Sequence, residues 1–344
     1  MTRNASRSYS TPELTDAAVP RHPLRGYLFI AGAAFFWGIS ATLGRAVFTG
    51  RFLPGGEALR PVDPLILAQS RTTFSLLVLV PILLMFRGRR SLAVGRSELL
   101  RFMVLGTLGL AASNYFYYLA IQQTTVATAI ILQYIAPVFV LLWMVGTREQ
   151  RATPHRIAGV ILAVLGCVLA IGIVSRISGA PYLWITGGSV RFNVVGVAAA
   201  LIAAVSFAFY NVYGRKLISS HDRWVVITYA FFGAAAAWLL INPPWRIIAA
   251  QYSPGQYLFL IVFAVLSVLI PFSLYFAGLH HLDATRAIVT SCLEPVFAIV
   301  IAAIALGEVV NGLQVIGIVL VLAATVLVQF PEKGKSATPL EPIE

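Results

Sequence analysis

Glu294 is a carboxylate in the middle of an otherwise apolar stretch that starts at Ala284. At 1.5 Å per helical residue it lies roughly 15 Å from Ala284, about half the ~30 Å thickness of the hydrocarbon layer of a membrane. A carboxylate at that depth costs free energy unless it is protonated, paired or facing water. Pro295 follows at once and removes one helical hydrogen bond beside it. A polar side chain next to freed backbone carbonyls at mid-depth predicts a transporter site.

Small and hydroxylated side chains share the helical face of Glu294, and we predict that Thr290 and Ser291 bind substrate with it. Such residues indicate either the wall of a cavity or close helix packing, which also favours small side chains in membranes. Glu294 is the candidate for proton coupling. Its alternative role is to hold the amine of a substrate as a carboxylate, and the sequence does not separate the two.

Polar and aromatic side chains in the other apolar runs extend the candidate site. We predict that the following residues also contact substrate: Gln133, Tyr134, Asn114, Tyr117, Tyr118, Tyr275, Trp37, Tyr210, Asn211 and Arg71. Aromatic side chains at spacings of three and four are also typical of helix packing. For Arg71, a structural hydrogen bond to helix-end carbonyls is as good an interpretation as contact with substrate.

The motif content argues against enzyme chemistry in this chain. It has no GxxxxGK[ST], HExxH or GxSxG pattern, so we expect no catalytic residue, no metal and no cofactor. The two cysteines, Cys167 and Cys292, both lie in apolar runs; we interpret them as packing residues and expect no disulfide between them.

Composition identifies the elements that must hold these side chains. Of 344 residues, 59% are hydrophobic and 11% are charged, whereas soluble domains carry about a quarter charged residues. Ten apolar runs approach or reach the roughly 20 residues that span a bilayer. We therefore predict an all-α polytopic membrane protein with ten transmembrane helices, over Gly26–Phe48, Leu65–Phe86, Leu99–Ile121, Val126–Val145, His155–Val174, Val194–Leu217, Trp224–Ile241, Gln256–His280, Ala284–Leu306 and Leu313–Phe330.

Lysine and arginine predict the orientation of these runs, because cytoplasmic loops carry the excess of both. Seventeen lie on the side of the two termini and five on the other side. Both termini are therefore expected in the cytoplasm, and for a bacterial chain the membrane is the cytoplasmic (inner) one. The same bias accounts for most of the net charge of +12 without a nucleic-acid partner.

The two halves of the chain are similar to each other. At an offset of 158, Tyr117-Tyr118 aligns with Tyr275-Phe276, and Pro137-Val-Phe aligns with Pro295-Val-Phe. Five helices per repeat is an odd number, so the second copy must cross the membrane inverted, as in alternating-access transporters. We expect a disordered cytoplasmic tail at 1–25, a first repeat at 26–175, an external linker at 176–192, a second repeat at 193–330 and a cytoplasmic tail at 331–344.

In these features the chain resembles the EamA-type branch of the drug/metabolite transporter superfamily. The resemblance rests on the five-plus-five arrangement, on Arg71 near the start of the second run, on Glu294-Pro295-Val-Phe-Ala and on Gly307-Glu308. It implies ten helices around a central cavity and export of small metabolites, often amino acids. The first half departs from the pattern, because Arg148-Glu149-Gln150 stands where the second half has Leu306-Gly307-Glu308.

Three functional hypotheses follow. The first is a secondary transporter that exports a small metabolite such as a neutral or aromatic amino acid by alternating access, with lipophilic cations or drugs as the alternative substrates. The second, an intramembrane lipid-modifying enzyme, needs several converging polar residues, whereas Glu294 stands almost alone. The third, a receptor or scaffold, has no soluble signalling domain in support. The expected partners are a small molecule, protons and membrane lipid, and we expect a monomer.

Overall fold

The computed structural model describes residues 22–49, 62–123, 126–170, 193–306 and 312–330. All regular secondary structure within these ranges is helical. Seven of the helices described are long and apolar enough to cross a membrane, namely Leu65–Arg87, Arg96–Ile121, Ala129–Gly146, Val194–Ile218, Arg223–Ile241, Pro254–Leu279 and Ala284–Ile301. Two further apolar helices, Pro154–Ala170 and Gly312–Leu327, are shorter.

In chain order the helices are α1 (Pro23–Thr49), α2 (Pro64–Arg87), the short 3₁₀ helix η1 (Arg89–Leu92), α3 (Arg96–Val104), the π-helical segment η2 (Leu105–Ala111), α4 (Ala112–Gln123), α5 (Val126–Gln133), α6 (Ala136–Gly146), α7 (Pro154–Ala170), α8 (Val194–Ile218), α9 (Arg223–Ile241), α10 (Pro244–Ala249), α11 (Pro254–Ala264), the π-helical segment η3 (Val265–Leu269), α12 (Ile270–Leu279), α13 (Ala284–Ser291), α14 (Glu294–Leu306) and α15 (Gly312–Leu327). The short helices η1 and α10 lie outside the predicted apolar runs. Glu308 and the predicted linker at 176–192 lie outside the described residues.

Acidic side chains begin several of these helices. Asp63 accepts from the backbone N–H of Leu65 at 2.8 Å, Asp222 from that of Trp224 at 2.9 Å and Asp283 from that of Arg286 at 2.8 Å. Each carboxylate satisfies an N–H that has no partner within its own helix and sits at the positive end of the helix dipole. These three carboxylates therefore mark where α2, α9 and α13 start.

The outward faces of the helices are apolar. Phe86 and Leu240 are 77% and 87% exposed, and many other large aliphatic side chains on the outer surface are also exposed. A water-soluble surface rarely carries so much contiguous apolar area. Together with the seven membrane-length helices, this identifies the chain as an integral membrane protein.

Two long helices change to π-helical geometry midway, and two others are broken. The π-helical segments are η2, between α3 and α4, and η3, between α11 and α12. The breaks fall between α5 and α6 and between α13 and α14. The second member of each pair lies close to 158 residues after the first, which is the offset between the two halves of the sequence.

Helices of one half pack mainly on helices of the other. α1 packs on α12, α13 and α14, whereas α8 packs on α4, α5 and α6. In the same way α2 packs on α11 and η3, and α9 on α3 and η2. We name α1, α2 and α11–α14 the first group, and α3–α6, α8 and α9 the second group, each with its π-helical segment.

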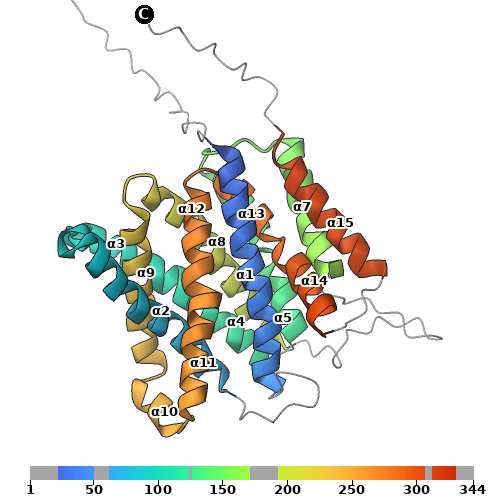
Figure 1. Cartoon of the computed structure of the whole chain (residues 1–344). Helices are drawn as coiled ribbons and strands as arrows, with labels where there is room; N and C mark the ends of the chain where they lie inside the picture. The colour runs from blue at the N-terminus through green and yellow to red at the C-terminus, as the bar shows by residue number, and fades with distance from the viewer. Residues whose placement is uncertain (1–21, 50–61, 124–125, 171–192, 307–311, 331–344) are drawn as a thin grey trace, which may run out of the picture.

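The helices α7 and α15 form a separate pair at one edge of the molecule (Figure 1). They cross closely at Gly166 and Gly317, where a Cβ on Gly317 would lie 2.4 Å from the backbone nitrogen of Ala170. The start of α1 and the end of α15 lie at the same end of the bundle, and α10 lies at the opposite end (Figure 1).

Candidate substrate site

The break between α13 and α14 leaves backbone groups without helical partners inside the bundle. α13 ends at Ser291 and α14 starts at Glu294, joined by a tight turn in which the N–H of Leu293 donates to the carbonyl of Thr290 at 3.1 Å. Pro295 has no N–H, so the carbonyl of Ser291 lacks its helical donor. The carboxylate of Glu294 therefore stands at a helix N-terminus, next to a freed carbonyl.

The break between α5 and α6 has the same construction. α5 ends at Gln133, α6 starts at Ala136, and the N–H of Ile135 donates to the carbonyl of Leu132 at 3.2 Å. Pro137 removes the helical donor of the Gln133 carbonyl. The residue that corresponds to Glu294 is Ala136, so only one of the two breaks carries a charge.

Tyr134 connects the two breaks. Its hydroxyl donates a hydrogen bond to the carboxylate of Glu294. Gln133, Tyr134 and Glu294 are all half-buried, whereas residues 287–293, which precede Glu294, are all buried. Two predicted site residues from opposite halves of the sequence therefore meet where two helices are interrupted.

Gly38 brings α1 close to the second break. A Cβ at this position would lie 2.9 Å from the backbone nitrogen of Ala298 and from the Cβ of Phe297, and 3.2 Å from the carbonyl oxygen of Glu294. These distances are shorter than normal van der Waals contacts and involve backbone atoms that cannot rotate away. Glycine at 38 is thus required for α1 to pack against the first turn of α14.

Arg71 is held against the π-helical segment η3. Its Nε donates to the Ser267 hydroxyl at 2.9 Å and one Nη to the Ser267 carbonyl at 3.1 Å. That carbonyl is free because Pro271, four residues later, has no N–H. The guanidinium lies 5.7 Å from the ring centroid of Phe263, and its other Nη is 3.4 Å from the Tyr118 hydroxyl. Arg71 therefore makes structural hydrogen bonds, but its carbonyl partner lies within a π-helical segment and not at a helix end.

The positive charge of Arg71 also acts on groups near the two breaks. It interacts electrostatically with Glu294 and with Tyr117, which in turn interacts with Glu294. Five N–H donors are available on a guanidinium, and Ser267 and Tyr118 do not use them all. Arg71, Tyr117 and Glu294 thus place a positive group, a phenol and a carboxylate within electrostatic range of one another.

The remaining predicted residues belong to a packed layer. Trp37, Tyr210 and Tyr275 are at most 8% exposed, and Trp37 and Tyr210 both pack on Phe272, with ring centroids 5.3 and 5.5 Å away. Asn211 donates to the Tyr275 hydroxyl, and a hydrogen bond joins the hydroxyls of Tyr275 and Ser291. This layer connects α8 through α12 to the end of α13.

Two other predicted residues bond within their own helices. The Thr290 hydroxyl donates to the carbonyl of Arg286 at 2.7 Å, and the Asn114 amide donates to the carbonyl of Leu110 at 3.0 Å. Thr290 is buried, whereas Asn114 is half-buried. The half-buried predicted residues are thus Arg71, Asn114, Tyr117, Gln133, Tyr134 and Glu294, of which Gln133, Tyr134 and Glu294 lie at the breaks.

Sequence reasoning missed Ser267 and Gly38. A signal for Ser267 was available, since it stands four residues before Pro271 and its carbonyl had to find another donor. Gly38 carried no signal, because a glycine in an apolar helix is also common where nothing approaches closely.

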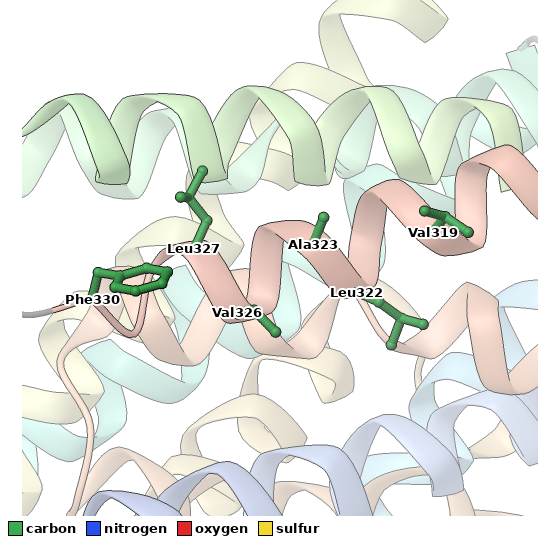
Figure 2. Close-up of a pocket in the computed structure, with 6 residues that line it drawn as sticks. All are labelled: Val319, Leu322, Ala323, Val326, Leu327 and Phe330. Carbon is green, nitrogen blue, oxygen red and sulfur yellow. The ribbon is translucent and has the colours of Figure 1, made fainter.

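Figure 2 shows an apolar groove on the outer face of α15. It is lined by Val319, Leu322, Ala323, Val326, Leu327 and Phe330. None of the predicted site residues lines this groove, and its side chains offer no hydrogen-bond donor or acceptor. It suits an acyl chain of the bilayer and not a polar metabolite.

Comparisons with known proteins show the family and the fold of the chain. A sequence model described as the EamA-like transporter family matches residues 24–172 and 194–330. An uncharacterized transporter of Archaeoglobus fulgidus is 27% identical over 82% of this chain and 93% of its own length. The threonine/homoserine exporter RhtA of Salmonella typhimurium is 25% identical over 79% of this chain and 85% of its own. One crystal structure, at 20% identity, superposes with a TM-score of 0.66 over 88% of this chain and 96% of that one, which shows a shared fold.

Proposed function

Because the chain belongs to the EamA-like transporter family, we propose that it is a secondary active transporter that exports a small metabolite, such as a neutral or aromatic amino acid, by alternating access. The observation that carries the proposal is the hydrogen bond from Tyr134 to Glu294. It joins two interrupted helices, one from each half of the chain, at the point where both have freed a carbonyl. Discontinuous helices that meet in this way are where transporters bind substrate.

The charges of the site suit a zwitterion. Glu294 offers a carboxylate to an amine, and the unused donors of Arg71 can face a carboxylate. Tyr117 and Tyr134 supply aromatic surface between them. The threonine/homoserine exporters among the relatives support an amino acid as the substrate class. A lipophilic cation would use Glu294 but would meet repulsion from Arg71, so it is the alternative.

The proposed architecture is ten membrane-spanning helices in two inverted repeats of five. The reciprocal packing of α1 and α8 supports it, as do the paired breaks and the paired π-helical segments at one offset. The family model also matches two separate segments, 24–172 and 194–330. We take these as the two repeats, with 176–192 as the external linker and with tails at 1–25 and 331–344.

The excess of Lys and Arg beside the termini supports a cytoplasmic location for both. One relative is named an inner membrane transporter, YicL of Salmonella typhimurium, which supports a bacterial inner membrane. We propose a monomer in which the first and second groups rock about the two breaks while α7 and α15 stay together at the edge. Substrate then reaches Glu294 from one side of the membrane at a time.

Two roles for Glu294 fit this mechanism. As a proton carrier it would bind a proton from outside and release it inside, exchanging it for substrate. As a ligand it would hold the substrate amine directly. Both need the carboxylate to face the transport path, and each predicts a different behaviour of the Glu294→Gln variant.

Flux through reconstituted protein tests the proposal. Proteoliposomes loaded with labelled threonine, homoserine, leucine, phenylalanine or tetraphenylphosphonium are assayed with a pH gradient in either direction. Efflux of at least one amino acid above that from protein-free liposomes is the expected result. Flux of tetraphenylphosphonium alone would replace the amino acid with a lipophilic cation, and no flux of any of them would contradict the proposal.

A further inference from the structure

Arg215, at the end of α8, reaches across to the turn between α12 and α13. One of its Nη atoms donates to the carbonyl of Leu279 at 3.0 Å and to that of Leu282. α12 ends at Leu279, so both carbonyls lie where the backbone has no further helical donors. Arg215 therefore satisfies the end of a helix to which it does not belong.

The two sides of this contact lie in different groups of helices. Arg215 is on α8 in the second group, whereas α12 and α13 are in the first. Next to it, Gly214 allows close approach, since a Cβ there would lie 3.0 Å from Cζ of Phe276. The turn is held from the other side by α1, where a Cβ on Gly26 would lie 2.6 Å from Leu282. Arg215 thus joins one group to a turn that is fixed within the other.

Further polar contacts surround this connection. The Thr285 hydroxyl donates to the Gln150 side chain at 2.7 Å, and Asp283 lies 3.7 Å from a guanidinium nitrogen of Arg156 and 3.3 Å from one of Arg286. Arg215 itself lies in the field of Asp283, Glu149 and Arg286. This end of the bundle is therefore held together by hydrogen bonds and charges.

We infer that Arg215 is the positioning residue that holds this end of the transport path closed, by latching α8 of the second group to the α12–α13 turn of the first. The inference rests on the proposed function, which places this end at the cytoplasm and has the two groups rock. The latch breaks when the cytoplasmic side opens to load substrate. It forms again when the loaded site turns outward.

A helix-capping contact that only stabilises the fold would look the same in one conformation, so the test must report which end is open. Nitroxide labels are placed at the exposed residues Ser220, beyond α8, and His280, beyond α12, after the buried Cys167 and Cys292 are replaced by alanine. Distances between the labels are measured by pulsed electron paramagnetic resonance in nanodiscs. The variants are Arg215→Gln, Arg215→Lys, and Lys216→Gln as the control, an exposed cation next along α8.

Arg215→Gln is expected to raise the ratio of the longer-distance population to the shorter about tenfold, as for the loss of one hydrogen-bonded charge. Arg215→Lys should fall between, because it keeps the charge but its ammonium nitrogen ends one bond short of the Nη atom that reaches both carbonyls. Lys216→Gln should match the parent protein. If Arg215→Gln lowers the melting temperature but leaves the distance distribution unchanged, Arg215 is only a cap and the inference is overturned.

Flux separates this outcome from a failure of the proposed function. In Arg215→Gln the latch is weakened. The KM for transport of an amino acid offered on the side where the cytoplasmic end of the protein lies should then be lower than in the parent protein. If the parent protein shows flux but the distance distribution is unchanged in Arg215→Gln, the latch is refuted and the proposed function stands. If the parent protein shows no flux, the proposed function is refuted.

Discussion

Replacing Tyr134 by phenylalanine removes the hydrogen bond that joins the two helix breaks and keeps the ring that packs beside them. A hydrogen bond to a charged acceptor contributes about 1.5–3 kcal/mol. Its loss therefore corresponds to a factor of about ten to a hundred in an equilibrium constant. Because the Glu294 carboxylate would lose its phenol donor inside the bundle, we expect kcat/KM for amino acid efflux to fall by about that factor.

The matched control is Tyr118→Phe. The Tyr118 hydroxyl lies 3.4 Å from a guanidinium nitrogen of Arg71, near the limit for a hydrogen bond, and Arg71 has two shorter contacts with Ser267. Loss of the Tyr118 hydroxyl should therefore lower kcat/KM by less than about threefold. Initial efflux rates from proteoliposomes at several substrate concentrations measure both variants, with melting temperature as the check on folding. The importance of the hydrogen bond from Tyr134 to Glu294 would be refuted if kcat/KM of Tyr134→Phe stayed within threefold of the parent value. An equal loss of kcat/KM in Tyr118→Phe would refute it too.

Two further substitutions test the close approach of α1 to the second break and a buried hydrogen bond between α2 and the end of α9. Gly38→Ala places a Cβ 2.9 Å from the backbone of Ala298 and should reduce efflux at least about tenfold by displacing α1 from the break. The control is Gly32→Ala, whose Cβ lies 3.4 Å from a Leu274 methyl and which should keep a rate near that of the parent. Equal efflux rates in the two variants would contradict the role of Gly38 in the close approach of α1. Gln69→Leu leaves the buried amide of Asn242 without its 2.7 Å partner and should destabilise the protein by about 1–3 kcal/mol in thermal unfolding. The double variant Gln69→Leu/Asn242→Leu should recover part of that stability. No recovery would show that the unpaired amide is not the cause of the destabilisation.

The course of the helices was largely predictable from the sequence, because apolar runs of membrane length and proline carry direct physical signals. Pro295 predicted the loss of one helical hydrogen bond beside Glu294, and the helix is interrupted there; the matching break before Pro137 falls inside a run that was predicted as one continuous helix. The π-helical segments were not predictable in this way. In η3 the helix widens just before Pro271, but whether a helix bends, breaks or widens before a proline depends on the neighbours that take up the freed carbonyl. Here Arg71 of α2 is that neighbour.

The site was predictable as a list of side chains and not as an arrangement. Glu294, Tyr134 and Arg71 stand out because charge and polarity are costly at that depth. That Tyr134 bonds to Glu294 depends on how the two halves interlock, which no single helix determines. The aromatic residues show the same limit, since Tyr117 is half-buried and Tyr275 is fully buried in the packed layer, although the two occupy equivalent positions in the repeat.

The central claim is that the carboxylate at the α13–α14 break takes part in transport, and Glu294→Gln tests it most directly. The measurement compares accumulation driven by a pH gradient with counterflow exchange of the same amino acid, in parent and variant proteoliposomes. If Glu294 carries the proton, the variant loses accumulation and keeps exchange; if it holds the substrate amine, the variant loses both. Accumulation and exchange that both stay within twofold of the parent would contradict the claim.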